Sequence, residues 1–284
     1  MHDPCPNRPS FKTHVGAHEE ILSNEFWFGD GEPHLGKQFT ARKAKERKAE
    51  IIDLLFRTAK AQRRVGNAGV ADQLEIVANK TFYCRPRRRC GSLACTECLR
   101  AFQKAKVAAQ RITIRQLTSE RDRKLLVMAN VIPLWITYRP NQLADLDVRK
   151  LNRWLKDALT RAGFKRVMMG SADFSWEADR GIYQPHWHIS TFTSDPEELS
   201  RRLKLLFPGR ERGDRPVVVS KTYSLKYLQY KNKAIKIAEL LRNNRRGLPY
   251  LLLLLDRTDP LELLVLFRLR VSAQNGELQF KPIR

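Results

Sequence analysis

The run Gln184-Pro185-His186-Trp187-His188-Ile189-Ser190 constrains this chain more than any other segment. Alternate side chains of a β-strand point to the same face of the sheet, so His186 and His188 share one face. Two imidazoles at this spacing can bind one metal ion, although such a pair also occurs as an ordinary polar pair. The run therefore predicts a strand with a candidate metal site on one face.

A β-hairpin is expected around this strand. Two apolar runs, 164–175 and 183–193, flank the turn-like sequence 177–181. If the hairpin turns near residue 179, Asp173 lies opposite His186 and becomes the natural third ligand, with Glu177 in reserve. Either residue also fits an exposed carboxylate of a hairpin. Imidazole and carboxylate ligands suit Mg²⁺ or Mn²⁺ with bound waters.

The segments around the hairpin predict an α+β fold. A strand is expected over 131–138, a helix over 148–162 closed by Gly163, a helix over 196–207, a strand over 216–220 and a helix over 222–242. Their order is β-α-β-β-α-β, which is that of an antiparallel sheet with the split topology of ferredoxin-like and RRM domains. A helix is also expected over 99–124, with a strongly positive polar face that carries Lys104, Lys106, Arg111 and Arg115.

The charge of the chain points to a polyanionic partner. Its 53 Lys and Arg outnumber 30 Asp and Glu, for a formal net charge of +23. Neutralising phosphates releases condensed counterions, so nucleic acid is the expected partner, although a basic surface can also serve solubility alone. The basic residues are spread along the chain rather than gathered beside an apolar anchor, so no membrane partner is expected.

Four cysteines form the second constellation, with the spacing Cys84-x5-Cys90-x4-Cys95-x2-Cys98. Four thiolates satisfy a closed tetrahedral zinc site, whereas free thiols or disulfides are the other readings of these residues. We expect structural Zn²⁺ here and a free thiol at Cys5. A loop folded around zinc would also present a cluster of guanidinium groups to DNA phosphates, namely Arg85, Arg87, Arg88 and Arg89.

A cluster of tyrosines and lysines offers a nucleophile. Tyr223-x-x-Lys226 is the first choice, because a lysine on the same helix face can stabilise the phenolate. Tyr227 is an alternative, and Tyr230-x-x-Lys233 repeats the spacing. Each tyrosine also fits a half-buried aromatic residue without a catalytic role.

Residues 80–240 resemble the HUH endonucleases, in particular the rolling-circle replication initiator (Rep) proteins of plasmids and phages. The resemblance rests on the cysteine-rich segment, the run Leu134-Trp135-Ile136-Thr137, the Gly170-to-Ser175 strand before Gln184-Pro185-His186-Trp187-His188, and Tyr223-x-x-Lys226. It implies that His186, His188 and Asp173 hold a divalent ion. It also implies that Tyr223 cuts single-stranded DNA, leaving a 5′-phosphotyrosine and a free 3′-OH. Many relatives carry Glu where this chain has Asp173.

On this basis we expect a flexible N-terminal arm (1–40), a basic helical segment (41–80), an HUH-type nicking domain (81–245) with its zinc element (84–98), and a C-terminal α/β extension (246–284). The apolar run 248–255 is too short to span a bilayer and is expected in the core. Without a secretion signal, the chain is expected in the bacterial cytoplasm, bound to single-stranded and origin DNA, with a host helicase or replisome as a further partner.

Two other functions fit the same residues. A transposase or relaxase would use the same chemistry, and the absence of a Gly-x4-Gly-Lys-Ser/Thr motif favours the simpler initiator. From a different class, the chain could be a zinc-stabilised DNA-binding regulator without catalysis.

Overall fold

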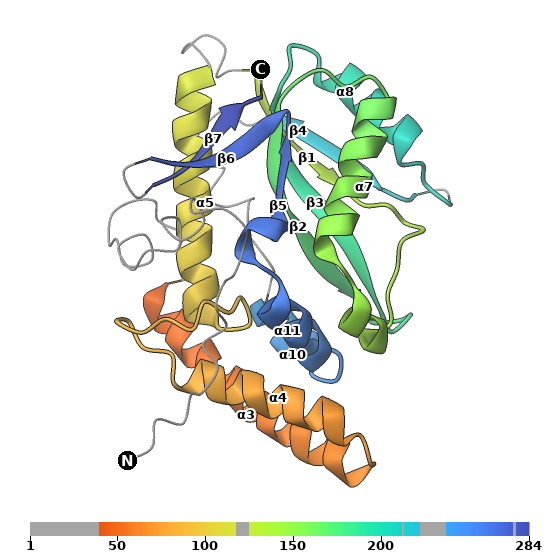
Figure 1. Ribbon diagram of the computed structural model, residues 1–284. Coiled ribbons are helices and arrows are strands. Elements are labelled where there is room, and N and C mark those ends of the chain that lie inside the picture. The colour runs from red at the N-terminus through yellow and green to blue at the C-terminus, as the bar shows by residue number, and fades with distance from the viewer. Residues whose placement is uncertain (1–39, 118–124, 212, 222–236, 275–276, 284) are drawn as a thin grey trace.

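The computed structural model describes residues 40–117, 125–211, 213–221, 237–274 and 277–283 (Figure 1). Residues 1–39 of the expected N-terminal arm lie outside this part of the chain, as do residues 222–236 of the expected helix 222–242. The helices are α3 (Ala41–Arg64), α4 (Ala68–Phe82), α5 (Thr96–Leu117), α7 (Val148–Arg161), α8 (Pro196–Leu206), α10 (Ile237–Asn243) and α11 (Leu248–Arg257). Two short 3₁₀ helices are η1 (Pro140–Asp145) and η2 (Pro260–Leu263).

The fold is mixed α+β and centres on a five-stranded antiparallel sheet in the order β4-β1-β3-β2-β5. Its strands are β1 (Leu126–Val131), β2 (Met168–Glu177), β3 (Ile182–Phe192), β4 (Val217–Lys221) and β5 (Leu264–Phe267), and a separate hairpin pairs β6 (Leu269–Gln274) with β7 (Glu277–Pro282). The expected order β-α-β-β-α-β is present as β1, α7, β2, β3, α8 and β4. The C-terminal strand β5 extends the same sheet beside β2.

The sheet has helices on both faces (Figure 1). Trp187 points to the face covered by α7, where its Nε1 donates a hydrogen bond of 2.7 Å to Asn152 Oδ1. On the opposite face, Lys106 of α5 reaches Ser171 of β2. Because side chains alternate along a strand, Asp173, His186 and His188 lie on the α5 face.

Local sequence signals set where α7 begins and ends. The Asp147 side chain caps α7 by accepting a hydrogen bond from the Lys150 N–H at 3.1 Å. The helix ends before Gly163, which has a φ of +70° and so adopts a backbone conformation that glycine tolerates best. Between these ends an apolar stripe, including the buried Leu155 and Leu159, packs on the sheet.

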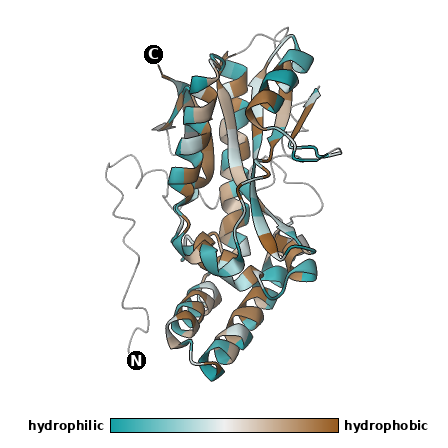
Figure 2. Cartoon of the chain, turned by 90° about the vertical axis from the view of Figure 1, so that its right-hand side faces the viewer, coloured by the Kyte–Doolittle hydropathy of each residue, from teal (hydrophilic) through white to brown (hydrophobic). Residues whose placement is uncertain are grey.

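The helical segment predicted for 41–80 is a helical hairpin of α3 and α4 (Figure 1). Hydropathy colouring shows helices that carry hydrophilic residues on one side and hydrophobic residues on the other (Figure 2). The apolar run 248–255 forms most of α11, where Leu251, Leu252 and Leu255 are buried, as expected for a core segment. In the described part of the chain, no helix is long and apolar enough to cross a membrane.

The prediction of a strand over 131–138 is wrong. The ladder ends at Val131, and the β-strand of this region is β1, residues 126–131. Pro133 has no N–H to donate to a ladder, and the aromatic residue that follows it packs elsewhere: Trp135 stacks on Phe207 with ring centroids 6.2 Å apart. The run Leu134 to Thr137, which is part of the resemblance to HUH endonucleases, therefore lies in a connection between elements.

Candidate functional site

The hairpin of β2 and β3 brings three metal-ligating side chains together. Asp173 pairs directly with His186 in the register, and His188 follows on the same face. Their ligand atoms converge: His186 Nε2 lies 3.2 Å from His188 Nε2, and Asp173 Oδ2 lies 3.4 Å and 3.7 Å from these two nitrogens. Ligands bonded to one ion at about 2.1 Å are separated by about 3 Å, so the arrangement fits a shared cation.

Buried polar atoms at this site remain without hydrogen-bond partners. Asp173 Oδ1 accepts a hydrogen bond from the Phe174 N–H at 2.7 Å, whereas Oδ2 forms none although it is buried. His186 Nδ1 is likewise buried without a hydrogen-bond partner. Such atoms are uncommon in protein interiors unless they face water or an ion. The exposed fraction rises from 1% for the Asp173 side chain to 17% for His188, so the site opens towards His188.

The electrostatics of the three residues suit metal binding. Burial raises the pKa of the Asp173 carboxyl, but the neighbouring His186 and His188 outweigh this effect and hold the pKa below its usual range. Burial lowers the pKa of His188, which Asp173 opposes only in part. The carboxylate is therefore ionised and the His188 imidazole neutral near pH 7, which are the forms that bind a metal ion.

A buried lysine adjoins this group. Lys106 Nζ donates a hydrogen bond of 2.8 Å to Ser171 Oγ, and Ser171 is the register partner of His188. The Lys106 side chain is completely buried, and this burial lowers its pKa to about 7 against the attraction of Asp173. The expectation that Lys106 lies on an outward positive face of its helix is therefore wrong.

Lys106 is one of several buried polar residues on α5. A row of polar residues on α5 has helical spacing and is buried against the rest of the fold, namely Gln103, Lys106, Gln110 and Thr113. Residues three or four apart share one face of a helix, so these side chains form a stripe. A stripe of this kind is normally apolar in a helix that packs on a sheet. Lys106 of this row contacts β2 of the main sheet, whereas Thr113 Oγ1 donates to the Phe280 carbonyl of β7 at 3.2 Å.

Gly170 allows β2 and β3 to approach each other beside the histidines. A Cβ atom at Gly170 would lie 1.9 Å from the His188 carbonyl oxygen and 2.9 Å from Ile189 Cα. No side chain fits at these distances without moving backbone. Glycine at this position therefore helps to set where β3 carries His188.

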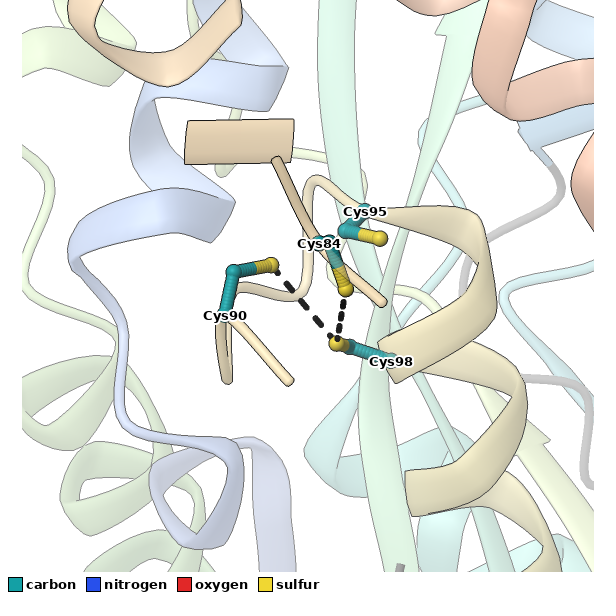
Figure 3. A group of neighbouring side chains, drawn as sticks. All are labelled: Cys84, Cys90, Cys95 and Cys98. Carbon is teal, nitrogen blue, oxygen red and sulfur yellow. Dashed lines mark hydrogen bonds between the residues drawn. The ribbon is translucent and has the colours of Figure 1, made fainter. Parts of the chain in front are cut away.

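The second candidate centre is the cysteine cluster at the start of α5 (Figure 3). Cys98 Sγ lies 3.6 Å from both Cys84 Sγ and Cys90 Sγ, and Cys95 completes the group. Sulfur atoms around a tetrahedral zinc with bonds of about 2.3 Å are separated by about 3.8 Å. The predicted four-cysteine group is therefore brought together at a spacing that fits one metal ion.

Charge around the cysteines favours a bound cation with thiolate ligands. Hydrogen bonding to Cys90 lowers the pKa of Cys84, and hydrogen bonding to Cys84 raises the pKa of Cys90 and Cys98. Four sulfurs this close cannot all carry negative charge unless a cation offsets it. Lys48 of α3 connects the two ends of the cysteine segment. Its Nζ donates a hydrogen bond of 2.6 Å to the Cys84 carbonyl and one of 2.9 Å to Glu97 Oε2.

The four arginines between Cys84 and Cys90 point in different directions. Arg85, Arg87 and Arg88 are exposed. Arg89 is turned inward: its side chain is 16% exposed, and its Nη1 lies 3.7 Å from Glu97 Oε1. Burial opposes the charged form of Arg89, but the neighbouring Cys98 and Cys84 outweigh it and raise its pKa. Arg89 thus faces the cysteine cluster, whereas the other three face solvent.

Two further sets of predicted residues have other outcomes. Glu177, the reserve ligand, pairs with Arg180 at 3.1 Å in the hairpin turn, apart from the Asp173 group. The predicted nucleophiles Tyr223, Tyr227 and Tyr230 and the lysine Lys226 lie outside the described residues.

No family model, curated protein or solved structure matches this chain.

Proposed function

We propose that this chain is a metal-dependent DNA nicking and joining enzyme of the HUH type, acting as a rolling-circle replication initiator of a plasmid or phage. The observation that carries the proposal is the convergence of Asp173 Oδ2, His186 Nε2 and His188 Nε2 on one face of an antiparallel sheet. Two imidazoles and one carboxylate leave positions open for waters or a phosphate oxygen, as a catalytic ion requires.

The arrangement of the sheet supports this proposal. The order β4-β1-β3-β2, with α7 and α8 as connections, is a split β-α-β arrangement, and we take it to be an HUH-type fold. The candidate ligands lie on its two central-hairpin strands, β2 and β3. Strands pack more rigidly than loops, so the three ligand atoms are held ready for an ion.

The proposed substrate is single-stranded DNA at a replication origin, in the bacterial cytoplasm. A formal net charge of +23 suits a polyanion, and phosphate contacts would supply most of the binding free energy. The four-cysteine cluster has a structural part in this proposal: Zn²⁺ would hold the Arg-rich loop and the start of α5. A host helicase or replisome remains the expected further partner of an initiator.

The proposed reaction is a transesterification. The phenolate oxygen of Tyr223 attacks the scissile phosphorus, the bond from phosphorus to the 3′ oxygen breaks, and that oxygen takes a proton to become a free 3′-OH. The products are a 5′-phosphotyrosine and a 3′-OH end, and attack by a 3′-OH reverses the step to join strands. A Mg²⁺ or Mn²⁺ ion held by Asp173, His186 and His188 would supply Lewis-acid activation of the phosphate. Lys226 would favour the phenolate by its positive charge, with Tyr227 as the alternative nucleophile.

A single assay tests the proposal. The full chain is incubated with labelled single-stranded origin DNA and Mn²⁺ or Mg²⁺, and denaturing gels are used to look for a covalent protein–DNA adduct. An adduct that requires the divalent ion is the expected result. Tight DNA binding without an adduct on any tested sequence would instead favour a zinc-stabilised regulator and overturn the nickase.

A further inference from the structure

Two consecutive aromatic residues are exposed beside the Arg-rich loop. Phe82 ends α4 and is 47% exposed, and Tyr83 follows it at 52%. Their rings meet edge to face, with centroids 5.1 Å apart. Large aromatic side chains usually bury most of their surface, so two adjacent rings left in solvent suggest a partner that covers them.

Positive charge borders these rings directly. The guanidinium carbon of Arg85 lies 5.9 Å from the centroid of the Phe82 ring, and Arg85 Nη1 donates to the Phe82 carbonyl at 2.6 Å and to the Cys84 carbonyl at 3.1 Å. Arg87 and Arg88 follow on the same short loop and are exposed. The sequence from Thr81 to Thr96 contains no acidic residue. Phe82, Tyr83, Arg85, Arg87 and Arg88 therefore form one surface, named here the aromatic-arginine patch.

The cysteine cluster fixes the shape of this patch. Cys84 and Cys90, which flank the loop, both belong to the four-thiol group. Between them the backbone turns tightly: Arg85 N–H donates to the Arg88 carbonyl at 3.1 Å, and Arg88 N–H donates to the Arg85 carbonyl at 3.0 Å. A loop held at both ends and across its middle loses little conformational entropy when it binds.

We propose that the aromatic-arginine patch binds single-stranded DNA by stacking unpaired bases on Phe82 and Tyr83 while the arginines contact the adjacent phosphates. The combination of ring faces and guanidinium groups is that of single-strand binding surfaces, because every base has a π-face and every nucleotide a phosphate. A duplex hides its base faces within the helical stack, so the two rings would add nothing to duplex binding. This inference rests on the proposed function for its choice of DNA as the nucleic acid.

The experiment measures binding of a fluorescein-labelled oligothymidylate and of a labelled duplex by fluorescence anisotropy, over a range of salt concentrations. The double variant Phe82→Leu/Tyr83→Leu keeps apolar bulk but removes both rings. We expect it to weaken single-strand binding by about tenfold or more while duplex binding changes little. The matched control is Ile76→Ala, which truncates another apolar side chain of α4 that is 63% exposed, and which should bind as the wild type does.

The arginines are tested separately. Arg87→Ala/Arg88→Ala should weaken binding to both DNA forms and reduce the slope of log affinity against log salt by about 0.7 per lost single-strand phosphate contact. Zinc content and circular dichroism of each variant must match those of the wild type, so that a lost loop is not mistaken for a lost contact.

The outcomes separate this inference from the proposed function. Unchanged single-strand affinity in Phe82→Leu/Tyr83→Leu overturns the patch, even if the chain forms the covalent adduct. An equal loss for single strand and duplex also overturns it, because stacking on unpaired bases predicts a difference. Ring-dependent single-strand binding without any adduct supports the patch and overturns the nickase instead.

Discussion

Lys106 Nζ and Ser171 Oγ form a hydrogen bond of 2.8 Å in the layer between α5 and the sheet, where Ser171 pairs directly with His188 in the strand register. An ammonium group placed there is costly, because burial disfavours the charged form. Its position beside Asp173 offers a reason for its presence, since the two charges attract each other inside the fold. Lys106 thus links the helix α5 electrostatically to the candidate metal site.

The burial of Lys106 predicts a pH-dependent stability. Its pKa is lowered from 10.5 to about 7, so between these values the unfolded chain binds more protons than the folded chain. Stability should therefore rise with pH across this window, by at most about 1.4 kcal/mol per pH unit from this group. Lys106→Met should lack that contribution. Urea unfolding of both proteins at pH 7 and pH 9, with a chelator present, measures the difference, and parallel pH dependences would contradict the prediction.

The close approach at Gly170 predicts a strong effect of one methyl group. Gly170→Ala should lower the free energy of unfolding by about 3 kcal/mol or more, because its Cβ would overlap the His188 carbonyl. Divalent metal binding should weaken with it, since β3 must shift. Gly69→Ala is the matched control: nothing lies within 4 Å of its Cβ, and alanine is the better helix former, so stability should rise by about 0.5–1 kcal/mol. Urea denaturation and Mn²⁺ titration of both variants give the comparison.

Patterns that repeat over a short span of sequence predicted their structures well. The pairing of Asp173 with His186 follows from counting back from the turn, since the hairpin leaves one register that keeps both apolar faces buried. The helix predicted over 148–162 from its apolar stripe and from Gly163 likewise became α7, residues 148–161. In both cases neighbours in the sequence supply the decisive contacts.

Features that depend on distant contacts were missed. Trp135 lies in an apolar and aromatic run that is typical of a strand. It packs instead on Phe207, more than seventy positions along the chain. Lys106 is a residue type that usually lies on a solvated helix face, and only the packing of α5 on the sheet shows that it is buried. A single sequence does not specify which helix face meets the sheet when that face is polar.

The proposed metal ligands can be tested by binding and cleavage together. His186→Ala and His188→Ala should each abolish measurable Mn²⁺ binding at the hairpin and lower metal-dependent cleavage by at least about 100-fold. DNA affinity should change little, because phosphate contacts elsewhere supply it. Ser190→Ala is the control on the same strand face, where Ser190 Oγ contacts Met128 Sδ at 2.9 Å. Cleavage at the wild-type rate by both histidine variants would refute the assignment.

Replacing two cysteines should remove the second metal ion and loosen the N-terminal helices. Cys95→Ser/Cys98→Ser should lose about one zinc per chain, with a fall in stability of several kcal/mol, because metal-binding free energy is also folding free energy. The loss should spread to α3, which is tied to this region by Lys48 and by the hydrogen bond of 2.6 Å from Thr96 Oγ1 to the Ala44 carbonyl. Elemental analysis and thermal unfolding measure both effects, with Cys5→Ser as the control. Absence of zinc from the wild-type protein would refute the assignment of a zinc site to the four cysteines.

The identity of the nucleophile decides whether the proposed chemistry is right. Tyr223→Phe removes only the attacking oxygen, so it should eliminate the covalent adduct while leaving DNA affinity unchanged. Lys226→Ala should slow adduct formation without moving the attachment point, because it removes a charge that favours the phenolate rather than the attacking atom. Tyr227→Phe should change the rate of adduct formation only mildly. Peptide mapping of the wild-type adduct by mass spectrometry locates the nucleotide directly. Attachment at Tyr227 or Tyr230 would replace Tyr223 as the nucleophile within the same reaction. Absence of an adduct on any tyrosine would leave the proposed reaction without its nucleophile and would refute the nickase.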